Sequence, residues 1–131
     1  MTLVLDANVA VAEAALPNRF ERYAREELVA PPLLWSEAWS TVHEAVWRGE
    51  VSGDVGRRLV LLVDEAPVER RAPRRLRPEA WRIAEELGWA KLYDAEYLAL
   101  ASLLGCRLVT LDGRLRRGAD RLGFVISPTE L

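Results

Sequence analysis

Short apolar runs alternate along the chain with longer stretches in which apolar residues recur every three or four positions. The short runs predict strands at residues 2–5, 29–30, 107–111 and 124–126. The longer stretches predict helices at residues 8–16, 19–28, 32–49, 52–66, 79–87, 94–104 and 114–121. Residues 67–78 are too rich in proline and arginine for a central strand, although Val68 can begin a strand at a sheet edge.

This alternation predicts an α/β protein in which a short parallel sheet lies between two layers of helices, a three-layer α/β/α sandwich. Residues 2–5 form an apolar run, as in a strand buried on both faces, and are expected to be the central strand. At 131 residues the chain has the length of one domain, which we expect to span residues 1–131.

The composition narrows the class of protein. Half of the residues are hydrophobic and 29% are charged, which argues against a disordered or fibrous chain. No apolar run approaches the roughly 18 residues of a membrane span, and we find no signal segment, so we expect no membrane contact and a cytoplasmic location. The formal net charge is -2, so any binding to a polyanion must depend on local positive charge.

Two acidic residues directly follow predicted strands. Asp6 comes after residues 2–5, and Asp112 comes after residues 108–111. Ligands of parallel α/β sheets bind at the carboxyl ends of the strands, so these carboxylates converge if the two strands are neighbours. Each Asp can instead cap the helix that follows it, and the sequence leaves both interpretations open.

Two further acids lie on predicted helices. Asp94 begins an otherwise apolar helix, where free N–H groups favour a negative charge, so capping is again an alternative. Glu37 lies one turn inside a helix beside its apolar stripe, a place that capping does not explain. The alternative for Glu37 is a solvated side chain at the edge of the stripe.

Converging carboxylates imply a cation, because they raise one another's pKa and destabilise the fold unless their charge is compensated. Oxygen ligands favour Mg²⁺ or Mn²⁺. Zinc is disfavoured because the chain has a single cysteine, Cys106, and a single histidine, His43, which lies well beyond Glu37. We expect Cys106 to be a small buried apolar residue and His43 to be a packing or surface residue.

The four acids lie in segments that occur in the order seen in PIN domains. These segments are residues 5–8 (Leu-Asp-Ala-Asn), 32–37 (Pro-Leu-Leu-Trp-Ser-Glu), 93–101 (Tyr-Asp-Ala-Glu-Tyr-Leu-Ala-Leu-Ala) and 109–112 (Val-Thr-Leu-Asp). Each motif alone is weak, but together they cover nearly the whole chain. The chain therefore resembles the PIN-domain family, and within it the VapC-type toxins of type II toxin–antitoxin systems.

The resemblance implies a Mg²⁺-dependent endoribonuclease, with Mn²⁺ as a substitute, that hydrolyses RNA phosphodiester bonds and leaves 5′-phosphate and 3′-hydroxyl ends. The family's acidic cluster corresponds to Asp6, Glu37, Asp94 and Asp112. We expect Asp6 and Asp94 to be the central metal ligands, with Glu37 and Asp112 binding directly or through water.

Other positions match the family less completely. Asn8 and Thr110 match its accessory polar positions, although Asn8 can simply start a helix and Thr110 can be an ordinary strand residue. Some relatives carry a further acid one turn beyond the last motif, where this chain has Arg116 and Arg117. The number of metal ions, one or two, therefore stays open.

The resemblance also implies partners. These are an RNA substrate, a small antitoxin whose C-terminal segment lies across the acidic groove, and a second copy in a homodimer, with DNA contacted only through the antitoxin. The sequence does not identify the RNA. Tryptophans at helical spacing favour core packing, and the alternative is that they line a partner surface; they are Trp39, Trp47 and Trp81.

An acidic centre repels RNA, so affinity is expected from a basic rim. Almost all the positive charge is arginine, which can fork onto phosphate oxygens, although a GC-rich genome is an alternative cause of this composition. The first candidates are Arg114, Arg116 and Arg117. The next are Arg19, Arg22, Arg74, Arg75 and Arg77. For each one, a solvated arginine without a ligand is the alternative.

Two rival functions remain. One is a catalytically silent PIN-like module that binds RNA or a protein without cutting. The other is an aspartyl phosphohydrolase, which needs a second acid two residues after the first, where this chain has Asn8. Mg²⁺-dependent scission of RNA distinguishes the nuclease from both.

Overall fold

Five parallel strands form one sheet in the order β3-β2-β1-β4-β5. The computed structural model describes all residues from 1 to 131. The strands are β1 (Thr2–Leu5), β2 (Glu27–Ala30), β3 (Val68–Arg70), β4 (Arg107–Val109) and β5 (Val125–Ile126). The apolar run of β1 lies at the centre, as predicted, and its residues Leu3, Val4 and Leu5 are buried.

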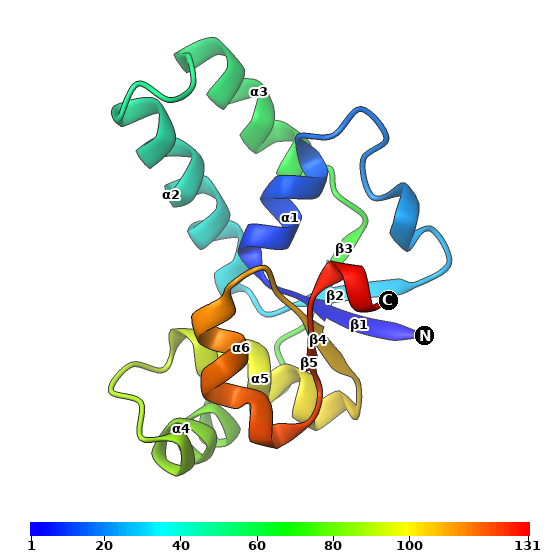
Figure 1. The fold of residues 1–131 in the computed structure, drawn as a ribbon, viewed down its shortest axis with the longest axis vertical. Helices are drawn as coiled ribbons and strands as arrows, with labels where there is room; N and C mark the ends of the chain where they lie inside the picture. The colour runs from blue at the N-terminus through cyan, green and yellow to red at the C-terminus, as the bar shows by residue number, and fades with distance from the viewer.

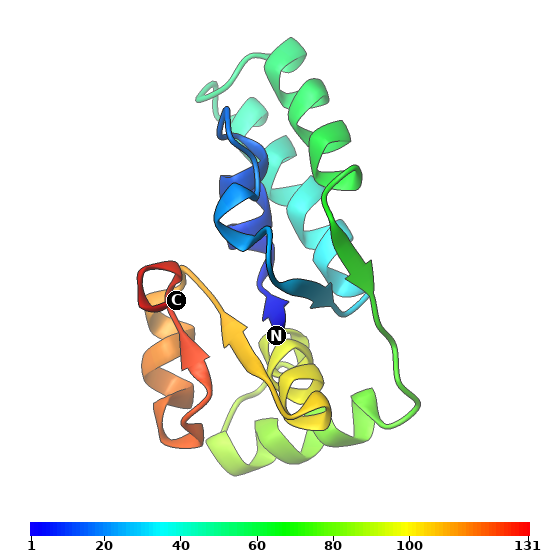
Figure 2. The same cartoon turned by 90° about the vertical axis from the view of Figure 1, so that its right-hand side faces the viewer.

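Helices cover both faces of the sheet (Figures 1 and 2). They are α1 (Ala7–Ala14), α2 (Leu33–Trp47), α3 (Gly53–Asp64), α4 (Leu76–Leu87), α5 (Tyr93–Leu104) and α6 (Gly113–Ala119). The first three lie on one face, and α4 and α5 lie on the other with α6 beside β5. The predicted three-layer α/β/α fold is confirmed.

The strand order creates a switch point beside β1. The chain runs outward from β1 through β2 to β3, and then returns to β4 and β5 on the other side of β1. Connections leave β1 and β4 toward different parts of the molecule, which opens a crevice at the carboxyl ends of these two strands. Asp6 and Asp112 follow β1 and β4, so the sheet brings both residues to this crevice.

One predicted helix is wrong. Residues 19–28 form only a short 3-10 helix at Glu21–Tyr23, and the segment then enters β2. Phe20 has a positive φ of 57°, which interrupts a right-handed helix. Leu28 is not on a helix face but pairs with Leu3 of the central strand. The smaller differences are in element ends: α4 begins at Leu76, and β4 ends at Val109.

Helices α2 and α3 pack against each other as a hairpin. The Ser52 hydroxyl accepts a hydrogen bond of 3.2 Å from the Val55 amide and caps α3. Gly56 allows the helices to approach closely, because a Cβ there would lie 2.5 Å from a methyl group of Val46. Substitution of Gly56 by a larger residue therefore forces the hairpin apart.

The prediction that three tryptophans pack in the core is wrong, because all three lie at the surface. Trp39, Trp47 and Trp81 are 43%, 84% and 64% exposed. The packed face of α2 is formed by other residues, Leu34, Ala38 and Val42, so the tryptophan spacing is helical without being the core spacing. His43 is exposed, and Cys106 is half-buried against the core. None of the helices combines the length and the apolar character that crossing a membrane requires.

Glu79 joins α4 to α5. Its carboxylate accepts hydrogen bonds of 2.8 Å from the Ser102 hydroxyl and from the Arg82 guanidinium, which donates the strongest of the interactions that lower the pKa of Glu79 to about 2. We expect Glu79→Gln to lower the free energy of unfolding by on the order of 1 kcal/mol at pH 7.

The pH dependence of this effect has a definite sign. Because the pKa is lower in the folded protein than its ordinary value of 4.5, the stabilisation is present above pH 4.5 and declines as the pH falls toward 2. Urea unfolding at several pH values measures it. Glu85→Gln, an exposed residue of the same helix, is the matched control and should have little effect; equal losses in both variants would contradict the prediction.

Candidate active site

Asp6 lies buried at the carboxyl end of β1 and is 6% exposed. Its amide donates a hydrogen bond of 3.0 Å to the Val109 carbonyl of β4, and its carboxylate accepts one of 2.8 Å from the Ala7 amide. Asp6 therefore caps α1, as one of the two interpretations predicted. Capping uses one carboxylate oxygen, Oδ1, and the other oxygen is held by a residue after β4.

That residue is Thr110. Its hydroxyl donates a hydrogen bond of 2.7 Å to Asp6 Oδ2 and accepts one of 3.0 Å from the Asp112 amide. In parallel, the Asn8 side-chain oxygen accepts a hydrogen bond of 3.2 Å from the Leu111 amide. The two accessory polar residues thus tie the ends of β1 and β4 together and fix the positions of Asp6 and Asp112.

The other two possible capping residues differ. Asp112 caps α6, because its Oδ1 accepts hydrogen bonds from the amides of Arg114 (2.9 Å) and Leu115 (3.2 Å). Asp94 makes no capping hydrogen bond at the start of α5. The helix therefore does not explain Asp94, and its carboxylate serves no backbone group.

Glu37 is half-buried and is held by a tyrosine of another helix. The hydroxyl of Tyr97, which is fully buried on α5, donates a hydrogen bond of 2.5 Å to Glu37 Oε1. Burial, with smaller contributions from this bond and from the Glu37 charge, raises the pKa of Tyr97 far above its usual range, so the phenol stays protonated. The sequence pattern predicted Tyr97 only as part of an apolar helix. It did not reveal that the Tyr97 hydroxyl donates to Glu37.

Three of the four acids line one cavity of about 620 Å³ at the crevice. They are Glu37, Asp94 and Asp112, and Asp6 lies behind them without lining it. The remaining lining residues include Trp89, Lys91, Tyr93 and Arg114. Arg114 was among the residues predicted from the sequence, and the other three were not. Their one signal in the sequence is that they lie within five positions before Asp94.

The carboxylates perturb one another. Burial is the main reason that the pKa of Asp6 rises from 3.8 to about 6, with further increases from Asp94 and Glu37 and opposing hydrogen bonds from Thr110 and Ala7. Burial also raises the pKa of Glu37 and of Asp94, the latter with a contribution from Asp112. The charges of Glu37 and Asp94 therefore act on Asp6, and the charge of Asp112 acts on Asp94.

The acids do not form a closed ligand cage. No three of the acidic, histidine and cysteine side chains lie close enough together to make a ready metal site. The donors nevertheless fit Mg²⁺ chemically, because all are oxygens and the cavity is open to water. Mg²⁺ usually keeps several water ligands and binds through one or two carboxylates, so a compact cage is not required.

The eight predicted arginines differ in what surrounds them. Arg114 lines the acidic cavity and lowers the pKa of Asp94. Arg116, by contrast, forms an ion pair with Glu130, and Arg22 lies 3.6 Å from Glu13. Arg74 and Arg77 line a second cavity, which shares the lining residue Tyr93 with the acidic one. Five of the eight predicted arginines line neither cavity: Arg19, Arg22, Arg75, Arg116 and Arg117.

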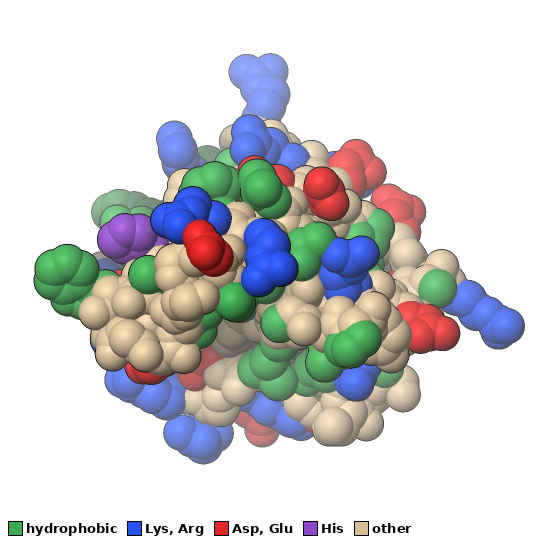
Figure 3. Space-filling model, turned by 90° about the horizontal axis from the view of Figure 1, so that it is seen from above, with side chains coloured by type: hydrophobic (Ala, Val, Ile, Leu, Met, Phe, Trp, Pro, Cys, Tyr) green, Lys and Arg blue, Asp and Glu red, His purple; other side chains and the backbone are tan.

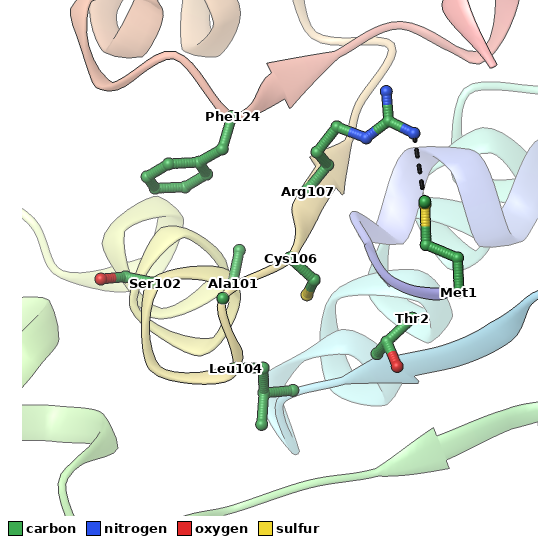
Figure 4. Close-up of a pocket in the computed structure, with 9 residues that line it drawn as sticks. Met1, Thr2, Ala101, Ser102, Leu104, Cys106, Arg107 and Phe124 are labelled. Carbon is green, nitrogen blue, oxygen red and sulfur yellow. Dashed lines mark hydrogen bonds between the residues drawn. The ribbon is translucent and has the colours of Figure 1, made fainter.

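Other surfaces do not compete with this site. Figure 3 shows positive and negative side chains interspersed on the face at the top of Figure 1, with no large patch of one sign. Figure 4 shows a cavity of about 520 Å³ at the amino ends of β1 and β4, the opposite edge of the sheet. Its lining contains Cys106 and Arg107 but no acidic residue, so the acids gather only at the carboxyl edge.

A family model described as the PIN domain matches residues 3–121. The chain belongs to the PIN domain family. Among curated PIN-type relatives, the VapC ribonuclease Mb0985 of Mycobacterium bovis and the ribonuclease VapC9 of Mycobacterium tuberculosis are each 33% identical to it over 114 residues. The alignments cover 86% of this chain and 87% of each relative.

Solved structures agree with this PIN fold. PAE2754 from Pyrobaculum aerophilum superposes with a TM-score of 0.76 at 25% identity, covering 99% of this chain and 91% of that one. VapBC2 from Rickettsia felis, bound to a DNA fragment from its promoter, gives a TM-score of 0.66 at 14% identity and covers 97% of both chains. The second likeness supports the fold of the PIN domain alone.

Proposed function

We propose that this PIN domain is a metal-dependent endoribonuclease that hydrolyses phosphodiester bonds in RNA. The observation that carries the proposal is the convergence of Glu37, Asp94 and Asp112 on one open cavity, with Asp6 directly behind it. Like charges gathered in this way raise the free energy of the folded protein unless a cation binds among them. RNA is chosen as the substrate because relatives named as ribonucleases are 33% identical to this chain over 86% of its length.

The residues that hold the cation in this proposal are Asp6 and Asp94, with Glu37 and Asp112 bound directly or through water. Mg²⁺ is the ion that suits these donors best, and Mn²⁺ is a substitute. When bound, the cation supplies activation of a water molecule and neutralisation of the charge that develops on the phosphoryl oxygens. The products then carry 5′-phosphate and 3′-hydroxyl ends.

The chain's own residues position this chemistry. Tyr97 donates to Glu37 and orients its carboxylate, while Thr110 holds Asp6 and the backbone of Asp112 at one fixed separation. Arg114 lies in the same cavity, where its positive charge can contact a phosphate of the substrate. None of these three groups needs to change its protonation state for that role.

We also propose that the protein is the toxin of a toxin–antitoxin pair, held inactive by a small antitoxin, active as a homodimer and located in the cytoplasm. This assignment is supported by one superposed structure, which is a toxin–antitoxin complex from Klebsiella pneumoniae. Co-purification with the product of an adjacent short gene tests this assignment.

The decisive experiment for the nuclease is cleavage of total RNA by the purified protein. We expect cleavage with Mg²⁺ or Mn²⁺, none after chelation with EDTA, and recovery when excess Mg²⁺ is added. End-labelling of the products identifies their 5′ and 3′ ends. RNA that is bound but never cut under these conditions would establish instead the catalytically silent binding module.

A further inference from the structure

Tyr93 separates two cavities of similar size. It lines the acidic cavity of about 620 Å³ and also a second cavity of about 580 Å³. The second cavity is lined by Pro32, Leu33, Ser36, Ala72, Pro73, Arg74, Leu76, Arg77, Tyr93 and Glu96. A chain molecule that occupies both cavities must therefore pass across the Tyr93 side chain.

The ring of Tyr93 is exposed although it begins a buried helix. The residue as a whole is 56% exposed. Ala95, Tyr97 and Leu98 of the same helix are buried, so the backbone beneath the ring is anchored by core packing. An exposed aromatic ring on an anchored backbone loses little conformational freedom when a flat ligand stacks on it.

Two tryptophans near these cavities each contact another residue of the protein. The guanidinium of Arg70 lies 5.3 Å from the centre of the Trp35 ring. The indole of Trp89 packs so closely on Gly118 that a Cβ at that position would lie 3.0 Å from it. Tyr93 makes neither kind of contact, and it is the aromatic residue that lines both cavities.

Positive charge lies on both sides of this ring. Lys91 and Arg114 line the acidic cavity, and Arg74 and Arg77 line the second one. Neither Arg74 nor Arg77 forms an ion pair with an acid of the protein. Glu96 is the one acidic residue in the second cavity, so two guanidinium groups outweigh one carboxylate there.

We propose that Tyr93 stacks against a nucleobase next to the scissile phosphate, and that Arg74 and Arg77 bind the backbone phosphate of the neighbouring nucleotide in the second cavity. Alternating aromatic and basic groups are how proteins hold single strands, because every base has a flat face and every linkage a charge. The base must be unpaired to stack on Tyr93 in this way, so the substrate is unpaired RNA. This inference rests on the proposed nuclease function.

The test removes the ring and the base separately. The probe is a labelled, unstructured RNA oligonucleotide with one cleavage site, together with versions that carry a single abasic nucleotide at each position in turn. We expect Tyr93→Ala to raise the KM for the intact RNA about tenfold, and Tyr93→Phe, which keeps the ring, to leave it nearly unchanged. One abasic position should weaken the wild type by a similar factor and have no further effect in Tyr93→Ala.

The arginines have their own readout. We expect the double variant Arg74→Ala, Arg77→Ala to weaken binding to all RNA sequences alike and to reduce its dependence on salt concentration. Two exposed residues outside both cavities, Trp47 and Arg58, provide the matched controls Trp47→Ala and Arg58→Ala, which should leave KM and the salt dependence unchanged.

The outcomes separate this inference from the proposed function. If the wild type does not cut RNA, the proposed function fails. If the wild type cuts RNA and Tyr93→Ala has the same KM as the wild type for the intact RNA and for each abasic version, only the stacking site is refuted. The same conclusion follows if Tyr93→Ala weakens binding of an acidic protein partner while its RNA KM is unchanged, since the groove then serves that partner.

Discussion

Replacing Asp94 by asparagine is expected to reduce RNA cleavage by about a thousandfold or more, the equivalent of about 4 kcal/mol in the activation barrier. Asp94 lies on the cavity wall with Glu37 and Asp112, and its carboxylate makes no capping hydrogen bond. The substitution removes a negative charge from the centre of the site while leaving the backbone hydrogen bonds of α5 in place. The loss should therefore appear in kcat without loss of the fold.

Initial cleavage rates and thermal unfolding of the same preparations measure the two parts of this prediction. Asp54→Asn makes the same chemical change at an exposed position on α3, where the carboxylate pairs only with Arg57, and should cut RNA at the wild-type rate. An Asp94→Asn variant that melts like the wild type and retains Mg²⁺-dependent cleavage contradicts the assignment of Asp94 as a metal ligand.

The positions of Asp6 and Asp112 could be predicted because their determinants are local. Each follows an apolar run, and parallel strands bring their carboxyl ends to one edge. The neighbouring placement of β1 and β4 was a condition of the prediction that the structure fulfils. Both residues cap the helices that follow them, and their role as metal ligands stays a prediction.

The support of Glu37 could not be predicted, because it depends on a contact across 60 positions of sequence. A tyrosine in an apolar helix has the same pattern whether its hydroxyl reaches a carboxylate or not. Arg116 pairs with Glu130, 14 positions away, and this contact could not be predicted from the sequence pattern either. Long-range partners decide the role of a side chain, and periodicity does not contain them.

The two structural errors have local and geometric causes. The helix expected at 19–28 fails at Phe20, since the apolar spacing continues through a residue whose backbone is left-handed. The tryptophans of α2 share a helical spacing with its core residues but lie on other faces, because the helix contacts α1 and α3 on a limited arc. Hydrophobic spacing predicts a helix more reliably than it predicts which face is covered.

Asparagine at position 6 is expected to make the metal-free protein more stable than the wild type by about 1–3 kcal/mol above pH 6. The pKa of Asp6 is raised, mainly by burial, from its ordinary 3.8 to about 6, so the ionised form is disfavoured in the folded protein. Asparagine retains an oxygen to accept from the Ala7 amide and an amide group that can donate to the Thr110 hydroxyl. The cap therefore survives while the buried charge is removed.

The sign of the pH dependence distinguishes this cause from a change in packing. Because the folded pKa lies above the unfolded one, the ionised carboxylate costs nothing below about pH 4, costs progressively more between pH 4 and 6, and has its full effect above pH 6. Urea unfolding in EDTA from pH 4 to 8 should show the difference between Asp6→Asn and wild type growing over that interval and then levelling. An Asp6→Asn protein that is less stable than wild type at every pH contradicts this account.

Added Mg²⁺ should reverse the order. An ion that binds only the folded wild type stabilises it in proportion to the logarithm of its concentration above Kd, whereas Asp6→Asn lacks the charge that attracts the ion and should gain little. Asp54→Asn again serves as the control and should follow the wild type with and without Mg²⁺. Together the two expected results test whether the buried charge at position 6 both lowers the stability of the metal-free protein and attracts the cation.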